Sequence, residues 1–181
     1  MLNTDIRYSP SINIIRDSNR ELDYIVTPNS VLVYDQIINN YLSGTHSFNI
    51  VGAYGTGKSS FLVALKHHLS NEQKYFAALN GNFKHINGFE FLPIIGDYSS
   101  LYDTFCKEFG LVEGNYSSQD LFNLIAKRYE SIRKKSFGWY IAIDEFGKFL
   151  EYAAKNNPEN RSSSLRHFVH KNIAPRVKQA A

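Results

Sequence analysis

A glycine-rich segment at residues 52–59, Gly-Ala-Tyr-Gly-Thr-Gly-Lys-Ser, constrains this chain more than any other feature. It fits the pattern G-x-x-x-x-G-K-[ST] at every fixed position. In such a segment the glycines let the backbone turn tightly and point its N–H groups inward, as an anion-binding nest at a helix N-terminus. Lys58 adds a mobile positive charge for the β- and γ-phosphates of a nucleotide, and the Ser59 hydroxyl adds a ligand for Mg²⁺. The segment therefore predicts a phosphate-binding loop.

The flanks of this loop have the order that the pattern requires, a strand before it and a helix after it. Residues 47–51 form a short, largely apolar run that predicts a buried parallel strand. Apolar residues after the loop recur at helical spacing; they are Phe61, Leu62, Leu65 and Leu69. The residues expected to bind the nucleotide are Gly52, Ala53, Tyr54, Gly55, Thr56, Gly57, Lys58, Ser59 and Ser60.

A second motif, Trp-Tyr-Ile-Ala-Ile-Asp-Glu at residues 139–145, is an apolar strand that ends in two adjacent carboxylates. Successive side chains of a strand point to opposite faces, but a turn directly after Asp144 lets both carboxylates line one crevice. Asp144 is then expected to hold Mg²⁺ through its water shell, and Glu145 to polarise the water that attacks the γ-phosphate. The alternative is that both acids only begin the following helix, whose N-terminal end favours negative charge.

Together the two motifs resemble the additional-strand, catalytic-glutamate branch of P-loop ATPases, which includes the AAA+ and STAND groups. Residues 51–62 and 143–154 are similar to the ATPase region of large bacterial ATP-binding proteins, some of them linked to phage defence. The likeness covers roughly residues 10–160 and makes residues 52–59 a Walker A motif and residues 140–145 a Walker B motif.

The resemblance implies an ATP hydrolase with ATP and Mg²⁺ as cofactors. Lys58 and Glu145 would be its catalytic residues, and Ser59 and Asp144 would be its metal ligands. In related ATPases a charge-stabilising arginine comes later in the chain or from a neighbouring subunit, and such a group contributes about 10³–10⁵ in rate. We therefore expect slow or absent hydrolysis by this chain alone, and other subunits or proteins as partners.

The remaining pattern predicts a three-layer α/β core with a parallel sheet that is incomplete at its C-terminal side. Strands are expected at 47–51, 89–95 and 139–143. Thr27 and Pro28 predict the start of a helix that Gly44 ends, residues 99–109 read as helical, and Ser117 with Asp120 predicts the cap of another helix. Residues 1–160 are assigned to the ATPase domain, with residues 1–26 as an N-terminal arm.

The last residues, 161–181, do not fit this core. They carry five Lys/Arg and no acidic residue, and they contain no convincing strand. The change in composition predicts a basic tail outside the core, in a chain truncated or frame-shifted after the Walker B helix. A basic tail also suits nucleic acid or another phosphate-rich partner.

Composition narrows the class further. Hydrophobic residues make up 43% and charged residues 20% of the 181-residue chain, which is typical of a globular protein with one core. There is no apolar run of membrane-spanning length and no signal-peptide pattern, so a cytoplasmic location without membrane contact is expected. The lone Cys106 excludes an internal disulfide and is expected to pack on a helix face. His67 and His68 are expected at the surface.

Other functions stay open at this point. The chain could be a nucleotide-gated interaction module that binds ATP without hydrolysing it, or a nucleic-acid-binding protein that uses the basic tail. A small-molecule kinase fits less well, because a glutamate beside the Mg²⁺ aspartate suits activation of water and no acceptor site is evident.

Overall fold

The structure is a computed structural model that describes residues 11–72, 74–79, 83, 86–111 and 116–156. Its elements run in the order α1 (Pro28–Leu42), α2 (Lys58–His67), η1 (His68–Glu72), β1 (Gly88–Ile95), α3 (Leu101–Glu108), α4 (Ser118–Lys134), β2 (Phe137–Asp144) and α5 (Gly147–Asn156). The π-helical turn η1 directly continues α2. The basic tail predicted at 161–181 lies outside the described residues.

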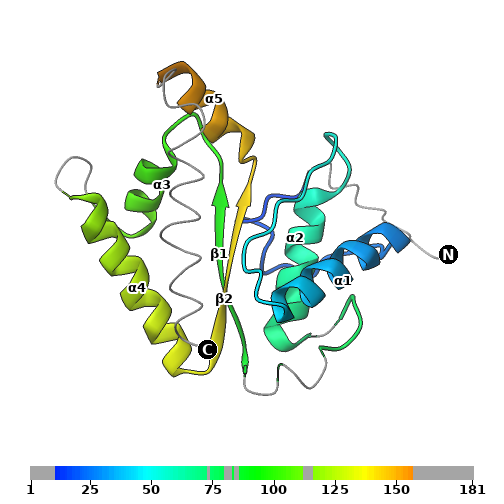
Figure 1. Ribbon diagram of the computed structural model, residues 1–181. Coiled ribbons are helices and arrows are strands. Elements are labelled where there is room, and N and C mark those ends of the chain that lie inside the picture. The colour runs from blue at the N-terminus through cyan, green and yellow to red at the C-terminus, as the bar shows by residue number, and fades with distance from the viewer. Residues whose placement is uncertain (1–10, 73, 80–82, 84–85, 112–115, 157–181) are drawn as a thin grey trace.

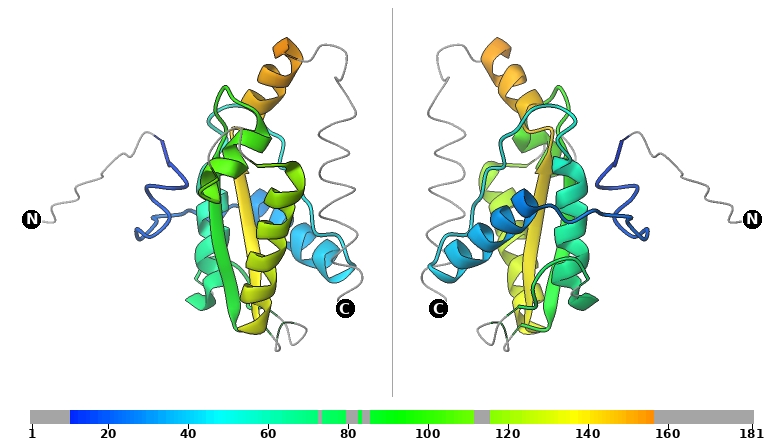
Figure 2. Two further views of the ribbon diagram at one scale, coloured as in Figure 1. Left: turned by 90° about the vertical axis from the view of Figure 1, so that its left-hand side faces the viewer. Right: turned by 90° about the vertical axis from the view of Figure 1, so that its right-hand side faces the viewer.

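A parallel pair of strands lies between helices on both of its faces. β1 and β2 pair in register from Gly88 opposite Phe137 to Ile95 opposite Asp144, which confirms the strands predicted at 89–95 and 139–143. Helices α3 and α4 cover one face, and α1 and α2 cover the other (Figures 1 and 2). The described residues thus form a mixed α/β fold with a small parallel sheet.

Alternate residues of the strands enter separate hydrophobic cores, as the twofold period of a strand requires. On the α3 and α4 side, Ile94 packs with Phe105 and Leu121. On the α2 side, Ala142 packs with Val63. Because both faces are buried in this way, both strands read in the sequence as nearly continuous apolar runs.

The strand predicted at 47–51 is wrong. These residues have no regular secondary structure and follow α1 as the chain leads into the loop. An apolar run becomes a strand only where a neighbouring strand takes up its backbone hydrogen bonds, and the sheet of the described residues consists of β1 and β2 alone. Val51, at the end of the run, is 86% exposed, so the run also lacks the burial that the prediction assumed.

The predicted helix starts are confirmed. Thr27 caps α1 in a reciprocal capping box with Ser30, and Pro28 takes the first helical position. Ser117 and Asp120 form the same kind of box at the start of α4. None of the helices in the described part of the chain is long and apolar enough to cross a membrane.

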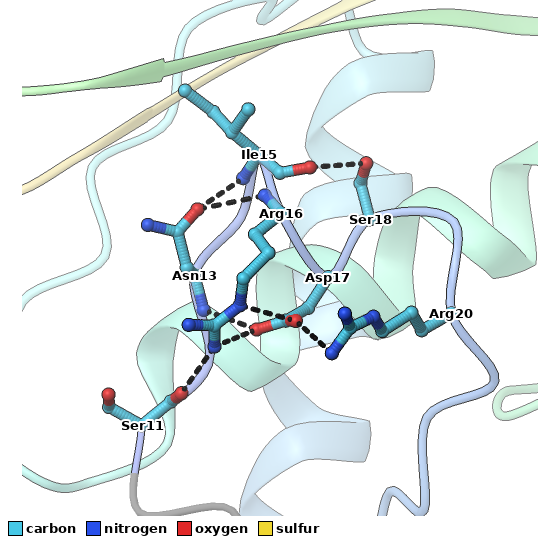
Figure 3. A network of polar contacts seen from close by, with 7 residues as sticks. All are labelled: Ser11, Asn13, Ile15, Arg16, Asp17, Ser18 and Arg20. Atoms are coloured by element: carbon cyan, nitrogen blue, oxygen red, sulfur yellow. Dashed lines mark hydrogen bonds and ion pairs between the residues drawn. The ribbon is translucent and has the colours of Figure 1, made fainter.

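A compact polar turn fixes the described part of the N-terminal arm (Figure 3). The Asp17 carboxylate accepts a hydrogen bond from the backbone N–H of Asn13 at 2.9 Å. It also accepts hydrogen bonds from two guanidinium nitrogens of Arg16, at 2.9 and 2.7 Å, and the Arg20 guanidinium lies 3.3 Å away. These hydrogen bonds, with that from Arg16 the largest cause, lower the pKa of Asp17 to about 2. The turn lets the neighbouring Ile14 bury completely in the core between α2 and β2.

Two histidines at the end of α2 are buried rather than at the surface, so that expectation is wrong. His67 is 6% exposed and His68 is fully buried, because the helix continues through η1 under α1 and the segment around Phe76. The His68 Nε2 lies 3.0 Å from the Tyr34 hydroxyl, which also donates to the Ala77 carbonyl at 2.8 Å. Cys106 packs in the core on α3, as expected.

Burial of His68 predicts a loss of stability in mild acid. Burial lowers the pKa of His68 below its ordinary value, so the unfolded chain takes up the proton more readily than the folded one. The stabilising effect of a neutral His68 is therefore complete above the unfolded pKa of about 6.5, and it is lost as the pH falls from that value through the lower pKa of the folded state. Urea unfolding should show that His68→Gln weakens the fall in unfolding free energy between about pH 7.5 and about pH 5.5.

The exposed His46 supplies the control. His46→Gln should keep the pH dependence of the wild type. Equal pH dependence in the wild type and in His68→Gln would contradict the assignment.

Candidate phosphate and metal site

The glycine-rich segment folds as an exposed loop that ends where α2 begins. Gly57 is the N-cap of α2, with φ 79° and ψ 19°, a left-handed conformation that glycine adopts without strain. Gly55 also has a positive φ, of 78°. Lys58, Ser59 and Ser60 form the first turn of α2, where backbone N–H groups have no partner within the helix. The residues that sequence reasoning named thus lie together at a helix N-terminus.

Polar contacts inside the loop fold it over itself. The Lys58 ammonium donates to the carbonyls of Gly52 and Ala53 at 2.9 and 2.7 Å. The Thr56 hydroxyl donates to the same Ala53 carbonyl at 2.8 Å. Tyr54, at the tip, is 96% exposed. The positive charge of Lys58 is therefore held at the loop backbone by neutral carbonyl groups.

A short hydrogen bond joins the end of the loop to the end of β2. The Ser59 hydroxyl donates to Asp144 Oδ2 at 2.6 Å, across a separation of 85 residues in the chain. This contact joins the two residues that the sequence assigned to Mg²⁺. Hydrogen bonds to a carboxylate are shorter and stronger than those between neutral groups, so this one fixes α2 against the carboxyl end of β2.

Directly after Asp144 the chain turns sharply, as the sequence reasoning required. Glu145 has a φ of 53°, in the left-handed region where a residue other than glycine is strained by about 1–2 kcal/mol. Its amide donates to Asp144 Oδ1 at 3.0 Å. Asp144 thus uses one carboxylate oxygen for Ser59 and the other for the turn that places Glu145.

The Glu145 side chain is held by a cation rather than by the loop. The Lys148 ammonium lies 2.5 Å from Glu145 Oε2, and both side chains are 48% exposed. Hydrogen bonding to Glu145 is the main cause that raises the pKa of Lys148, with smaller electrostatic contributions from Asp97 and Glu151. Lys148 therefore stays charged at neutral pH beside the proposed catalytic carboxylate.

Sequence reasoning missed Lys148 and Gly96. Gly96 directly follows β1, and its amide donates to the Asp144 carbonyl at 2.8 Å. In the sequence, a Gly-Asp pair after an apolar strand indicates only a turn. That Gly96 lies close to Glu145 becomes evident only when the register of β1 and β2 is known. Lys148 follows Glu145 by three residues, the spacing of neighbours on a helix surface, and this spacing was the available signal.

The donor set fits Mg²⁺. Ser59 and Asp144 offer hard oxygen atoms, and Mg²⁺ keeps several waters and phosphate oxygens rather than a full protein cage. Within the described residues, no three His, Cys, Asp or Glu side chains gather into a metal-binding group.

Comparisons with known proteins give no further guidance, since no family model, curated protein or solved structure matches this chain.

Backbone strain at Glu145 predicts that glycine is tolerated there. Glu145→Gly relieves about 1–2 kcal/mol of left-handed strain and adds about 0.5–1 kcal/mol of chain entropy cost. Thermal unfolding should therefore show unchanged or slightly raised stability.

Ser136, with φ 58°, is the matched control because it turns the chain at the opposite end of β2. Ser136→Gly should give a similar stability change. Clear destabilisation by Glu145→Gly alone would show that the Glu145 side chain stabilises the fold instead of serving a function.

Proposed function

We propose that this chain is an ATP-binding module of the P-loop ATPase type, with Mg²⁺-nucleotide bound at the N-terminus of α2. The observation that carries the proposal is the 2.6 Å contact of Ser59 with Asp144. Two motifs recognised independently in the sequence meet at that point, with their oxygen atoms adjacent. A chance glycine-rich turn would not require an acidic strand end beside its serine.

In this proposal each loop residue has one task. The N–H groups from Gly55 to Ser60 bind the phosphates as an anion nest at the start of α2. Lys58 exchanges its bonds to the Gly52 and Ala53 carbonyls for bonds to the β- and γ-phosphates. Those bonds are stronger, because both partners are then charged. The exchange needs only rotation of a side chain, since the ammonium already lies against the loop.

Ser59 and Asp144 are the residues that would hold Mg²⁺, Ser59 directly and Asp144 through water. The ion would supply positive charge that neutralises the negative charge developing on the phosphate oxygens. For this, Ser59 must turn its hydroxyl hydrogen away from Asp144.

Glu145 is proposed as the residue that orients and polarises the attacking water, with its carboxylate as the proton acceptor. The Lys148 ammonium contacts Oε2 of Glu145, and the Glu145 side chain is half exposed. Water can therefore reach the other carboxylate oxygen, Oε1. The expectation of slow hydrolysis by the chain alone is retained in this proposal, as is a charge-stabilising group from a partner subunit.

The proposal also covers the larger fold of the domain and its cellular setting. The two strands and the helices on both faces would be part of a three-layer P-loop core with a larger parallel sheet. A cytoplasmic bacterial ATPase, in some relatives of phage-defence type, is the setting that the motif resemblance favours.

Lys58→Ala tests the phosphate site. Loss of a charge-assisted bond to phosphate is worth about 1.5–3 kcal/mol, so calorimetric titration with MgATP should show affinity about ten- to a hundredfold lower.

The control is Lys66→Ala, which removes the same charge from α2 at a position where the ammonium contacts Asn19 instead. It should leave affinity unchanged. If Lys58→Ala binds MgATP as well as the wild type, the phosphate-loop assignment is wrong.

A further inference from the structure

We propose that Gly96, at the carboxyl end of β1, is a positioning residue for the catalytic carboxylate of Glu145. The inference rests on the proposed function, because it concerns the same site. Among the described residues, no hydrogen bond joins Gly96 to the phosphate loop. It acts on the site through the backbone of Asp144 and Glu145.

The segments that follow β1 and β2 touch backbone to backbone at this point. The parallel ladder ends with Ile95 opposite Asp144, and the Gly96 amide extends it with a 2.8 Å bond to the Asp144 carbonyl. The chain then turns at Glu145 across the end of β1. A Cβ atom on Gly96 would overlap the Glu145 carbonyl oxygen and lie 2.9 Å from its carbonyl carbon.

Glycine is needed here for space and not for backbone freedom. The φ angle of Gly96 is not positive, so residues other than glycine can adopt it. The close approach of the Glu145 carbonyl group is the main reason that a side chain is excluded, and the Asp144 carbonyl oxygen would also lie only 3.2 Å from a Cβ atom. A clash with backbone has no flexible side chain to absorb it, so the Glu145 turn itself must move.

That turn cannot yield without moving the carboxylate. The Glu145 carbonyl accepts the Lys148 amide at 3.0 Å at the start of α5, and the Glu145 carboxylate is bound to the Lys148 ammonium. A displaced carbonyl therefore shifts both Glu145 and its cation. The Ser59–Asp144 contact is made by a side chain one residue earlier, from a position inside the ladder. Displacement should therefore affect hydrolysis more than nucleotide binding.

Gly138, in β2, offers a matched control. A Cβ atom there would overlap the ring of Phe89, a side chain at the other end of the same sheet. Gly138→Ala thus introduces the same methyl group into the same strand pair, with a cost in stability but no contact with Glu145.

The test compares the full chain with Gly96→Ala and Gly138→Ala in two measurements. The first is the position of the Glu145 and Phe146 amide resonances in ¹⁵N NMR spectra. Gly96→Ala should move them and leave those of Gly57 to Ser59 in place, whereas Gly138→Ala should move neither set. Unmoved Glu145 resonances in folded Gly96→Ala would overturn the proposal.

The second measurement is single-turnover hydrolysis at saturating MgATP, with affinity measured in parallel. Gly96→Ala should slow hydrolysis about ten- to a hundredfold, the range expected for misplacement of a reacting group by about 1 Å. Its MgATP affinity should stay within about threefold of the wild type. In a Glu145→Gln background the same substitution should have no further effect, because both changes act through one carboxylate.

Additive losses in the double variant, or an equal loss in Gly138→Ala, would overturn the proposal. Failure of the proposed function looks different. A wild type that does not bind MgATP removes the nucleotide site, and one that binds without turnover removes the hydrolytic role of Glu145. In either case the amide resonances alone decide whether Gly96 sets the position of the Glu145 turn.

Discussion

The contact between the Ser59 hydroxyl and the Asp144 carboxylate is the interaction on which the proposed site depends. It joins the first turn of α2 to the end of β2, and thereby the phosphate loop to the acidic pair. The apolar contacts beneath it keep these elements in place, since Ile14 and Val63 pack against Ala142 in one buried cluster. The Ser59–Asp144 contact and the hydrophobic core therefore both hold the N-terminus of α2 beside the carboxyl end of β2.

The local conformations that depend on neighbouring residues were predicted correctly from the sequence. The loop, the start of α2 and the caps of α1 and α4 depend on residues within a few positions of one another, such as Thr27 with Ser30. The failed strand at 47–51 depends on a distant neighbour that the local sequence does not contain. His67 and His68 were misplaced for a similar reason, because the path of η1 beneath α1 decides their burial.

The surroundings of Glu145 show the same limit within the site. That Asp144 and Glu145 can share a crevice followed from a turn after the strand, and the left-handed φ of Glu145 provides that turn. The bare backbone of Gly96 and the cation of Lys148 become visible only once β1 and β2 are in register. Three features act on the position of the Glu145 carboxylate: the strained turn at Glu145, the lack of a side chain at Gly96 and the ion pair with Lys148. Backbone strain of this kind tends to persist where function requires it.

The central claim is that Ser59 and Asp144 form one Mg²⁺-dependent nucleotide site. A double-mutant cycle with Ser59→Ala and Asp144→Asn tests it most directly, measured by calorimetric titration with MgATP and with ATP in excess EDTA. The account predicts that each substitution weakens binding of MgATP, that binding of metal-free ATP changes little, and that the two effects are coupled by about 1 kcal/mol or more. Strictly additive losses, or equal losses with and without Mg²⁺, would contradict it.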